Sequence, residues 1–296
     1  MDLKAYLAQR KEMVDRALEE ALPEVNGPAE NLGRAMRYSL LAGGKRLRPI
    51  LCLAGAEAVG ALPETAMPAA LALEMIHTYS LIHDDLPSMD DDDLRRGKPT
   101  SHKVFGEALA VLAGDGLLTE GLGILARAGY QGLIPSDRAL FALDVIARAS
   151  GKEGMIAGQV LDLESEGREV DESVVRFIHS RKSGALIAAS VTSGAILGGG
   201  TQSQITAMNR YGQCVGLAFQ ITDDILDIEG DPEQMGKKVG VDQARGKATY
   251  PRVVGRTRSR EVAQEMVAQG QAALAEFGVE AEPLRKIAAY LLMRRK

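Results

Sequence analysis

A chain of 296 residues with 46% hydrophobic and 25% charged content has the size and composition of a globular protein with a large core. The formal net charge of −5 argues against a general nucleic-acid binder, which needs a basic excess to neutralise phosphates. The two cysteines, Cys52 and Cys214, lie far apart in apolar segments, which indicates buried thiols in a reducing compartment. Charges at the N-terminus replace the apolar core of a signal peptide, so we expect a cytoplasmic protein.

Helical periodicity runs through almost the whole chain, and alternating β-branched runs are scarce. We therefore predict an all-α fold, and the lack of a linker favours a single domain over residues 1–296. The predicted helices cover residues 2–21, 28–42, 49–60, 64–85, 102–128, 136–149, 151–164, 171–181, 182–198, 202–229, 249–276 and 281–294.

Two features bear on how these helices pack. The uncharged stretch 183–209 is long enough to raise the question of a membrane span, but small polar residues dilute it. We predict no membrane span and a buried central helix in its place. The 32 glycines are many for a helical protein, and we expect close helix packing to compensate for their low helix propensity.

A basic loop, Gly43-Gly44-Lys45-Arg46-Leu47-Arg48-Pro49, separates two predicted helices. Pro49 suits the first turn of the second helix. Lys45 and Arg48 can then face an anion at a helix N-terminus, where backbone N–H groups and the macrodipole add to the attraction. A glycine cap with solvated bases is the alternative, but the acidic clusters that follow favour a phosphate site.

Two acidic clusters, Asp84 to Asp93 and Asp223 to Asp227, each follow an apolar helical stretch. Like charges 4 Å apart repel by roughly 4 kcal/mol at an effective dielectric constant near 20, so such clusters need water or a bound cation. Oxygen ligands favour Mg²⁺, which completes its shell with water and substrate phosphates. Solvated helix ends are the alternative, but two clusters beside basic segments favour a magnesium-dependent diphosphate site.

The spacing within each cluster predicts its local geometry. Pro87 disfavours a continuous helix, so Asp84 and Asp85 close a helix while the following aspartates return on a loop. In the second cluster, Asp223 and Asp227 are spaced i, i+4 and share a helix face with Gln220.

Basic residues near the clusters are further candidates. Arg95 and Arg96 carry planar guanidinium groups that suit diphosphate oxygens, or they neutralise the preceding aspartates. His77 lies two turns before Asp84 on nearly the same face, although a lone histidine is usually structural.

Two later segments combine charge with small residues. Arg181-Lys182-Ser183-Gly184 allows a helix to kink and expose carbonyl groups. The segment 230–251 is rich in Gly and Lys, which is typical of a phosphate-binding lid, with a disordered surface loop as the alternative.

Together these motifs resemble those of the trans-isoprenyl diphosphate synthases, most closely the bacterial farnesyl diphosphate synthases. The resemblance covers nearly the whole chain. The matching segments are GGKRLRP at 43–49, EMIHTYSLIHDDLPSMDDDDLRRGKPTSH at 74–102, GMIAGQVLDL at 154–163, RKSGAL at 181–186, GLAFQITDDILD at 216–227 and GKKVGVDQARGKATYP at 236–251. One departure is Ser183, where the family more often has Thr, but the hydroxyl is kept.

The resemblance implies the isoprenoid synthase fold, with helices around a deep central cavity, and a homodimer. It also implies head-to-tail condensation of isopentenyl diphosphate with dimethylallyl diphosphate and then with geranyl diphosphate, giving farnesyl diphosphate. A geranylgeranyl or geranyl diphosphate synthase is the nearest alternative. A catalytically silent partner subunit, a terpene cyclase and an acidic metal buffer are less favoured because every motif for two diphosphates is present.

By resemblance, each site residue takes a role. Three magnesium ions, with manganese as a possible substitute, would be held by Asp84, Asp90 and Asp223, with nearby or water-bridged ligands from Asp85, Asp91 and Asp227. The allylic diphosphate would be bound by Arg95, Lys182, Ser183, Gln220, Lys237 and Lys247. Isopentenyl diphosphate would be bound by Lys45, Arg48, His77 and Arg96. The allylic cation would be stabilised by the Lys182 carbonyl, the Ser183 hydroxyl and the Gln220 amide oxygen.

Product length depends on where the growing tail stops. Tyr79 lies five residues, about 7.5 Å along a helix, before Asp84, and Ser80 lies one turn before it. A tail hanging from the metal site into an apolar cavity would meet the Tyr79 ring as a floor. This favours a fifteen-carbon product.

Overall fold

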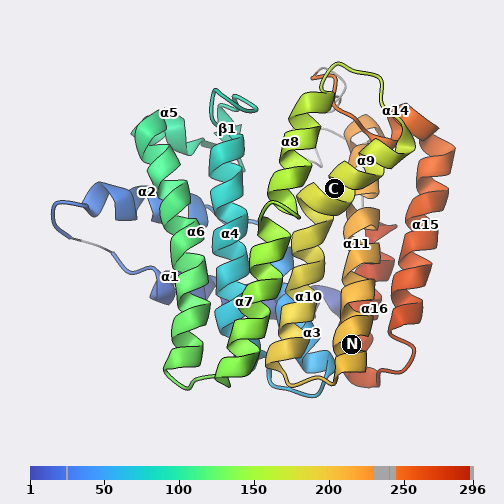
Figure 1. Ribbon diagram of the computed structural model, residues 1–296, viewed down its shortest axis with the longest axis horizontal. Helices are drawn as coiled ribbons and strands as arrows, with labels where there is room; N and C mark the ends of the chain where they lie inside the picture. The colour runs from blue at the N-terminus through green and yellow to red at the C-terminus, as the bar shows by residue number, and fades with distance from the viewer. Residues whose placement is uncertain (25, 230–239, 241–244, 294–296) are drawn as a thin grey trace.

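A computed structural model describes residues 1–24, 26–229, 240 and 245–293, and this part of the chain is built almost entirely of helices (Figure 1). In chain order the helices are α1 (Leu3–Ala21), α2 (Glu30–Leu40), α3 (Leu47–Ala58), η1 (Pro63–Ala66), α4 (Met67–Asp84), α5 (Ser101–Phe105), α6 (Glu107–Tyr130), α7 (Ser136–Ser150), α8 (Met155–Ser165), α9 (Glu172–Ile178), η2 (His179–Gly184), α10 (Ala185–Leu197), α11 (Gln202–Glu229), α14 (Tyr250–Val254), α15 (Arg256–Ala273), η3 (Val279–Ala281) and α16 (Glu282–Leu291). The all-α prediction is confirmed. The described residues contain one two-stranded hairpin, β1 (Leu94–Arg95) with β2 (Lys98–Pro99).

Several predicted helix boundaries were wrong, for identifiable reasons. The predicted helices 102–128 and 249–276 are each divided, at Gly106 (φ 86°) and Gly255 (φ 82°), because a positive φ ends a helix. Helix α3 begins at Leu47, two residues before the expected start at Pro49. Proline is tolerated there because the first four N–H groups of a helix have no intrahelical partner. No junction separates the predicted helices 171–181 and 182–198, since the π-helix η2 joins α9 to α10.

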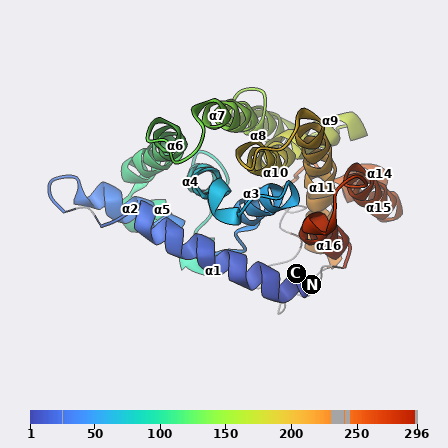
Figure 2. The ribbon, with the colours of Figure 1, turned by 90° about the horizontal axis from the view of Figure 1, so that it is seen from below.

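The centre of the bundle is α10, whose residues from Leu186 to Leu197 are all buried. Figure 2 shows α10 between α3 on one side and α7 and α8 on the other. A Cβ atom on Gly194 would overlap the carbonyl of Cys52 in α3, so these two helices touch at their backbones. The predicted buried central helix and the close glycine packing are both confirmed. Cys52 and Cys214 are buried free thiols, as predicted.

Helices α6 and α7 lie side by side at the edge of the bundle (Figures 1 and 2). Among the described residues, α6 is the one helix that is long and apolar enough to cross a membrane. The core helix of a globular protein can meet the same criteria, so one such helix is weak evidence for a membrane span. The outer faces expose Val111 and Leu112 of α6 and Leu140 and Phe141 of α7. Because the two helices run in opposite directions, the two exposed pairs lie near opposite ends of this face, and exposed apolar groups on one face are a feature of protein contacts.

Candidate active site

The first acidic motif folds back on itself at the end of α4. Asp84 ends the helix, and the N–H of Asp90 donates to the Asp84 carbonyl at 2.8 Å. Asp91 is exposed and adopts a left-handed conformation (φ 48°) that tightens this turn. The predicted return of Asp90 and Asp91 on a loop is therefore confirmed, and it brings the loop carboxylates beside the helix end.

The carboxyl groups of this motif crowd one another. Burial raises the pKa of Asp84 to about 6; Lys182 and Arg95 oppose the shift, and Asp90 and Asp85 add to it. Burial likewise raises the pKa of Asp85, although Arg95 donates to it from Nε at 2.9 Å. Their burial and their closeness to one another make the charged forms of both carboxyl groups less favourable. Carboxylate oxygens in that condition fit a hard divalent cation such as Mg²⁺.

Basic side chains contact the motif directly. Arg95 pairs with Asp85 and, from Nη2, with Asp92 at 3.3 Å. Arg245 pairs with Asp92, and Lys247 Nζ lies 3.1 Å from Asp90 Oδ1. Neutralisation of the aspartates, the alternative role for Arg95, is thus observed. Among the described residues, no three acidic, histidine or cysteine side chains are set in a ready-made metal cluster.

The second acidic motif lies on α11 and divides its carboxylates between two tasks. Asp224 is buried and accepts from Tyr250 N at 2.9 Å, and it pairs with His179 Nε2 at 2.6 Å. It thereby ties α11 to α14 and to the π-helix η2. Asp223 lies about 100° around the helix axis from Asp224, whereas Asp227 lies about 60° from Asp224 and faces the same cavity.

The π-helix η2 carries Lys182 and Ser183. Single π-turns within α-helices are frequent at functional sites. Ser183 Oγ donates to Gln220 Oε1 at 2.8 Å, and Lys182 Nζ lies 2.6 Å from Asp162 Oδ2. The predicted irregularity is present, but as a wide helical turn rather than a kink. It brings Lys182, Ser183 and Gln220 together across two helices.

Arg46 in the basic loop is structural. It is buried in a left-handed conformation, and its Nη1 lies 2.6 Å from Glu74 Oε1 and its Nε 2.7 Å from Asp15 Oδ1. Its Nη2 also donates to the Leu40 carbonyl at 2.8 Å. These bonds fix the loop against α4 and α1. The backbone that carries the neighbouring Lys45 and Arg48 is therefore held in place.

We expect Glu74→Gln to lower the free energy of unfolding by about 3 kcal/mol, because the buried Arg46 guanidinium loses its closest counter-charge. Urea unfolding measures this. Glu12→Gln, which removes an exposed pair with Arg16, is the control and is expected to change stability by less than about 0.5 kcal/mol. Equal effects of the two substitutions would contradict the structural role of Arg46.

Positive charge gathers around His77. Burial lowers the pKa of His77 well below its usual range, and Arg48, Arg96, Arg95 and Arg46 lower it further. Burial also lowers the pKa of Arg48 to about 10, with Glu74 and Asp223 opposing the shift and Arg96 adding to it. Arg96 donates to the Gly43 carbonyl, which places it at the basic loop. Half-buried and exposed arginines gathered beside a neutral imidazole suit an anionic ligand.

The residues predicted to set product length lie below the first motif. Tyr79 is buried, and its ring packs edge-on against His83 with 5.6 Å between centroids. Burial and the nearby Asp84 raise the pKa of Tyr79 to about 12. His83 reaches the Val111 carbonyl of α6 at 3.0 Å. Tyr79 therefore stands close to Asp84 in the contact between α4 and α6, and half-buried Ser80 bonds to the His77 carbonyl.

Two polar residues of α8 lie in the matching segment 154–163 but were given no role from the sequence. Asp162 is buried and accepts from both Lys182 and Lys247. Gln159, three residues earlier, is also buried, and its amide has no hydrogen-bond partner in the described part of the chain. The available signal was two polar residues at i, i+3 within the apolar stretch 155–163. Lys237, by contrast, lies outside the described residues.

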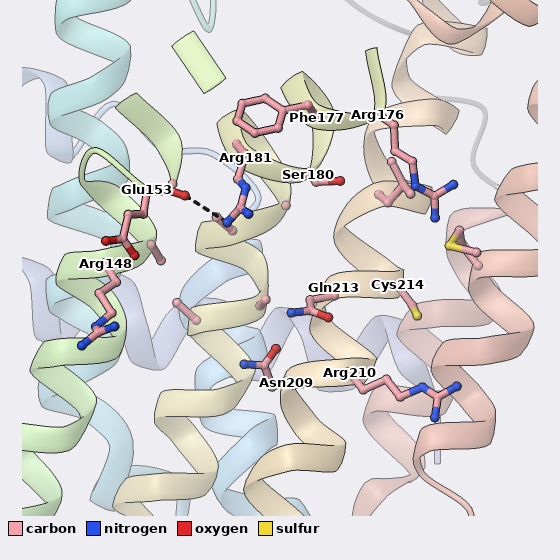
Figure 3. Close-up of a pocket in the computed structure, with 18 of the residues that line it drawn as sticks. Arg148, Glu153, Arg176, Phe177, Ser180, Arg181, Asn209, Arg210, Gln213 and Cys214 are labelled. Carbon is pink, nitrogen blue, oxygen red and sulfur yellow. Dashed lines mark hydrogen bonds between the residues drawn. The ribbon is translucent and has the colours of Figure 1, made fainter. Parts of the chain in front are cut away.

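Two cavities compete as the position of the site. The larger, about 790 Å³, is rimmed by Arg148, Arg176, Arg181 and Arg210 (Figure 3), but it contains no residue of either acidic motif. A cavity of about 600 Å³ is lined by Asp224, Asp227 and Lys247. The second cavity holds two carboxylates of the second motif, and its Lys247 also contacts Asp90 of the first motif, so it is the better candidate for the site.

The chain is similar to known proteins over nearly its whole length. The Polyprenyl synthetase family profile matches residues 29–278. A farnesyl diphosphate synthase from Geobacillus stearothermophilus is 49% identical over 261 residues, which cover 88% of this chain and 87% of that protein. The heterodimeric geranylgeranyl pyrophosphate synthase large subunit 1 of Arabidopsis thaliana is 46% identical over 297 residues, covering 99% of this chain and 80% of that one. The apo crystal structure of an FPP/GFPP synthase from Zymomonas mobilis matches with a TM-score of 0.85 and 38% identity over 98% of each chain.

Proposed function

Because the chain belongs to the polyprenyl synthetase family and is a short-chain trans-prenyl diphosphate synthase, we propose that its main product is farnesyl diphosphate. Isopentenyl diphosphate would condense with dimethylallyl diphosphate and then with geranyl diphosphate. The observation that carries the proposal is the convergence of both acidic motifs with the basic loop. Lys247 contacts Asp90 of the first motif and lines a cavity with Asp227 of the second. Asp223 of the second motif interacts electrostatically with Arg48 of the basic loop.

The two diphosphates have different tasks, which supports two different sites. The allylic diphosphate leaves, so the negative charge that develops on it needs stabilisation, while the other diphosphate remains as an anchor. Magnesium would supply this stabilisation at Asp84, Asp90 and Asp223, with Asp85, Asp91 and Asp227 alongside. Manganese is the possible substitute. The cationic surroundings of His77 suit the anchoring diphosphate, held by Lys45, Arg48, His77 and Arg96 without a metal.

Residues of η2 and α11 would act on the allylic cation. Because Ser183 donates its hydroxyl proton to Gln220, its oxygen lone pairs remain for the cation. Serine in place of the threonine common in the family keeps this function. Lys182, Lys247 and Arg95 would bind the leaving diphosphate, as would Lys237, and that diphosphate would accept the final proton. A cytoplasmic location stays a prediction.

Substrate omission tests the proposed reaction. We expect labelled prenyl product only when isopentenyl diphosphate, an allylic diphosphate and Mg²⁺ are all present, and loss of product with EDTA. Product formed from the allylic diphosphate alone would indicate a cyclase. No product under any combination would favour a silent partner subunit. Relatives are named for both farnesyl and geranylgeranyl products, so geranylgeranyl or geranyl diphosphate is the alternative product.

We also propose a homodimer formed through the exposed apolar faces of α6 and α7. Leu112→Glu is expected to shift the protein to a monomer in light scattering coupled to size exclusion, because a charge placed in an apolar interface must be desolvated. Leu62→Glu is the matched control, since Leu62 is 73% exposed and lies on neither helix. A monomeric wild type, or dissociation of both variants alike, would contradict this interface.

A further inference from the structure

One carboxylate outside both acidic motifs contacts two lysines of the site. Asp162 of α8 is buried, and its Oδ2 lies 2.6 Å from Lys182 Nζ and 3.1 Å from Lys247 Nζ. The two lysines come from distant parts of the chain, one from η2 and the other from the segment that precedes α14. A single oxygen atom thus holds two ammonium groups side by side.

The backbone around Asp162 fixes its position. A Cβ atom on Gly158 would overlap the backbone nitrogen of Lys182, so α8 and η2 are in direct backbone contact. Asp162 lies one turn after Gly158 on the same face of α8 and is therefore held at this contact. Although burial raises its pKa, Lys182 and Lys247 outweigh that effect and hold the pKa of Asp162 below its ordinary value.

Lys247 has further anionic partners whose roles differ from that of Asp162. It lies 3.1 Å from Asp90 Oδ1 and 2.7 Å from Glu166 Oε1. Under the proposed function Asp90 would bind magnesium. Glu166 is a partly exposed side chain at the end of α8. Asp162 is the buried partner that keeps Lys247 beside Lys182 when Asp90 is engaged elsewhere.

We propose that Asp162 is a positioning residue, which holds Lys182 and Lys247 together so that both ammonium groups meet the leaving allylic diphosphate. This inference rests on the proposed function, since it assigns both lysines to that diphosphate. Like charges this close repel, and the shared carboxylate offsets the repulsion. Without it, the lysines would separate and the developing negative charge would lose preorganised donors.

Steady-state kinetics of Asp162→Asn tests the proposal. We expect kcat to fall about 10- to 100-fold and KM for dimethylallyl diphosphate to rise, with KM for isopentenyl diphosphate changed less than about twofold. Glu164→Gln removes an exposed carboxylate from the same helix and is expected to change kcat less than about twofold. The double variant Asp162→Asn with Lys247→Gln is expected to lose less kcat than the product of the two single-variant reductions, because both substitutions remove the same contact.

The outcomes separate this inference from the proposed function. An inactive wild type refutes the reaction itself. An active wild type with an unaffected Asp162→Asn variant, or with both KM values raised equally, refutes the positioning role alone. If Asp162→Asn does not fold, Asp162→Glu retains the carboxylate but moves it by one methylene. In that variant a selective loss for the allylic substrate supports the role, and wild-type kinetics overturns it.

Discussion

Asp84→Asn is expected to lower kcat about 1,000-fold and at the same time to stabilise the metal-free protein. Under the proposed function the activity falls, because Asp84 would hold a metal ion that stabilises the leaving diphosphate by several kcal/mol. The stability rises because burial and the crowding carboxylates already raise the pKa of Asp84 to about 6, so its ionised form is unfavourable in the folded state. Opposite effects on activity and stability are the signature of strain held at a functional site.

The same shift fixes the pH dependence of stability. The pKa of Asp84 is about 6 in the folded chain, against an ordinary value of 3.8 for an aspartate. The native state therefore binds more protons than the unfolded state between these values, and the contribution of Asp84 to stability falls as pH rises through this window. With EDTA present, we expect the contribution of Asp84 to lower the free energy of unfolding of the wild type by about 2 kcal/mol between pH 4.5 and pH 7. This contribution is expected to be absent in Asp84→Asn.

Thermal unfolding with EDTA at pH 4.5 and pH 7, together with kcat at saturating Mg²⁺, measures both effects. Asp93→Asn is the control, because Asp93 belongs to the same acidic run but is exposed and paired with Lys103. It is expected to leave kcat within about threefold of wild type. A destabilised Asp84→Asn variant, or one with normal kcat, would show that Asp84 is an ordinary structural carboxylate.

Tyr79→Ala is expected to shift the main product from fifteen to twenty carbons. The buried ring stands close to Asp84 where α4 meets α6, and its removal opens space below the first motif for one more isoprene unit. The same deletion is expected to cost about 3 kcal/mol of stability. Chromatography of the dephosphorylated alcohols measures the product.

Tyr79→Phe is the matched control, since it keeps the ring and removes the hydroxyl. It is expected to retain the fifteen-carbon product. Farnesol from Tyr79→Ala under the same substrate ratio would contradict a floor at this position. Lengthening by both variants would assign the effect to the hydroxyl instead of the ring.

Local sequence signals predicted the parts of the site that local chemistry determines. The i, i+4 spacing placed Asp223 and Asp227 on one face of a helix that α11 confirms over its full length. Pro87 predicted the return of the first motif on a loop, and the hydrogen bond between Asp90 and Asp84 confirms it. Each depends on residues within one or two helical turns, where periodicity and proline sterics dominate.

The missing parts depend on contacts between distant segments. The Lys247–Asp90 bond joins residues 157 positions apart, and the Lys182–Asp162 bond joins a π-turn to another helix. No spacing rule predicts such pairs. The helix breaks at Gly106 and Gly255 were missed because a glycine inside a helical pattern is usually tolerated, and only the observed positive φ shows that the helix ends there.

The product of the wild-type enzyme is the most direct test of the central claim. Purified protein is incubated with Mg²⁺, labelled isopentenyl diphosphate and dimethylallyl diphosphate, and the dephosphorylated alcohols are resolved by chain length. Farnesol is expected as the main alcohol. Geranylgeraniol or geraniol as the main alcohol would contradict the proposed stopping point at Tyr79, and absence of any metal-dependent alcohol would contradict the proposed reaction.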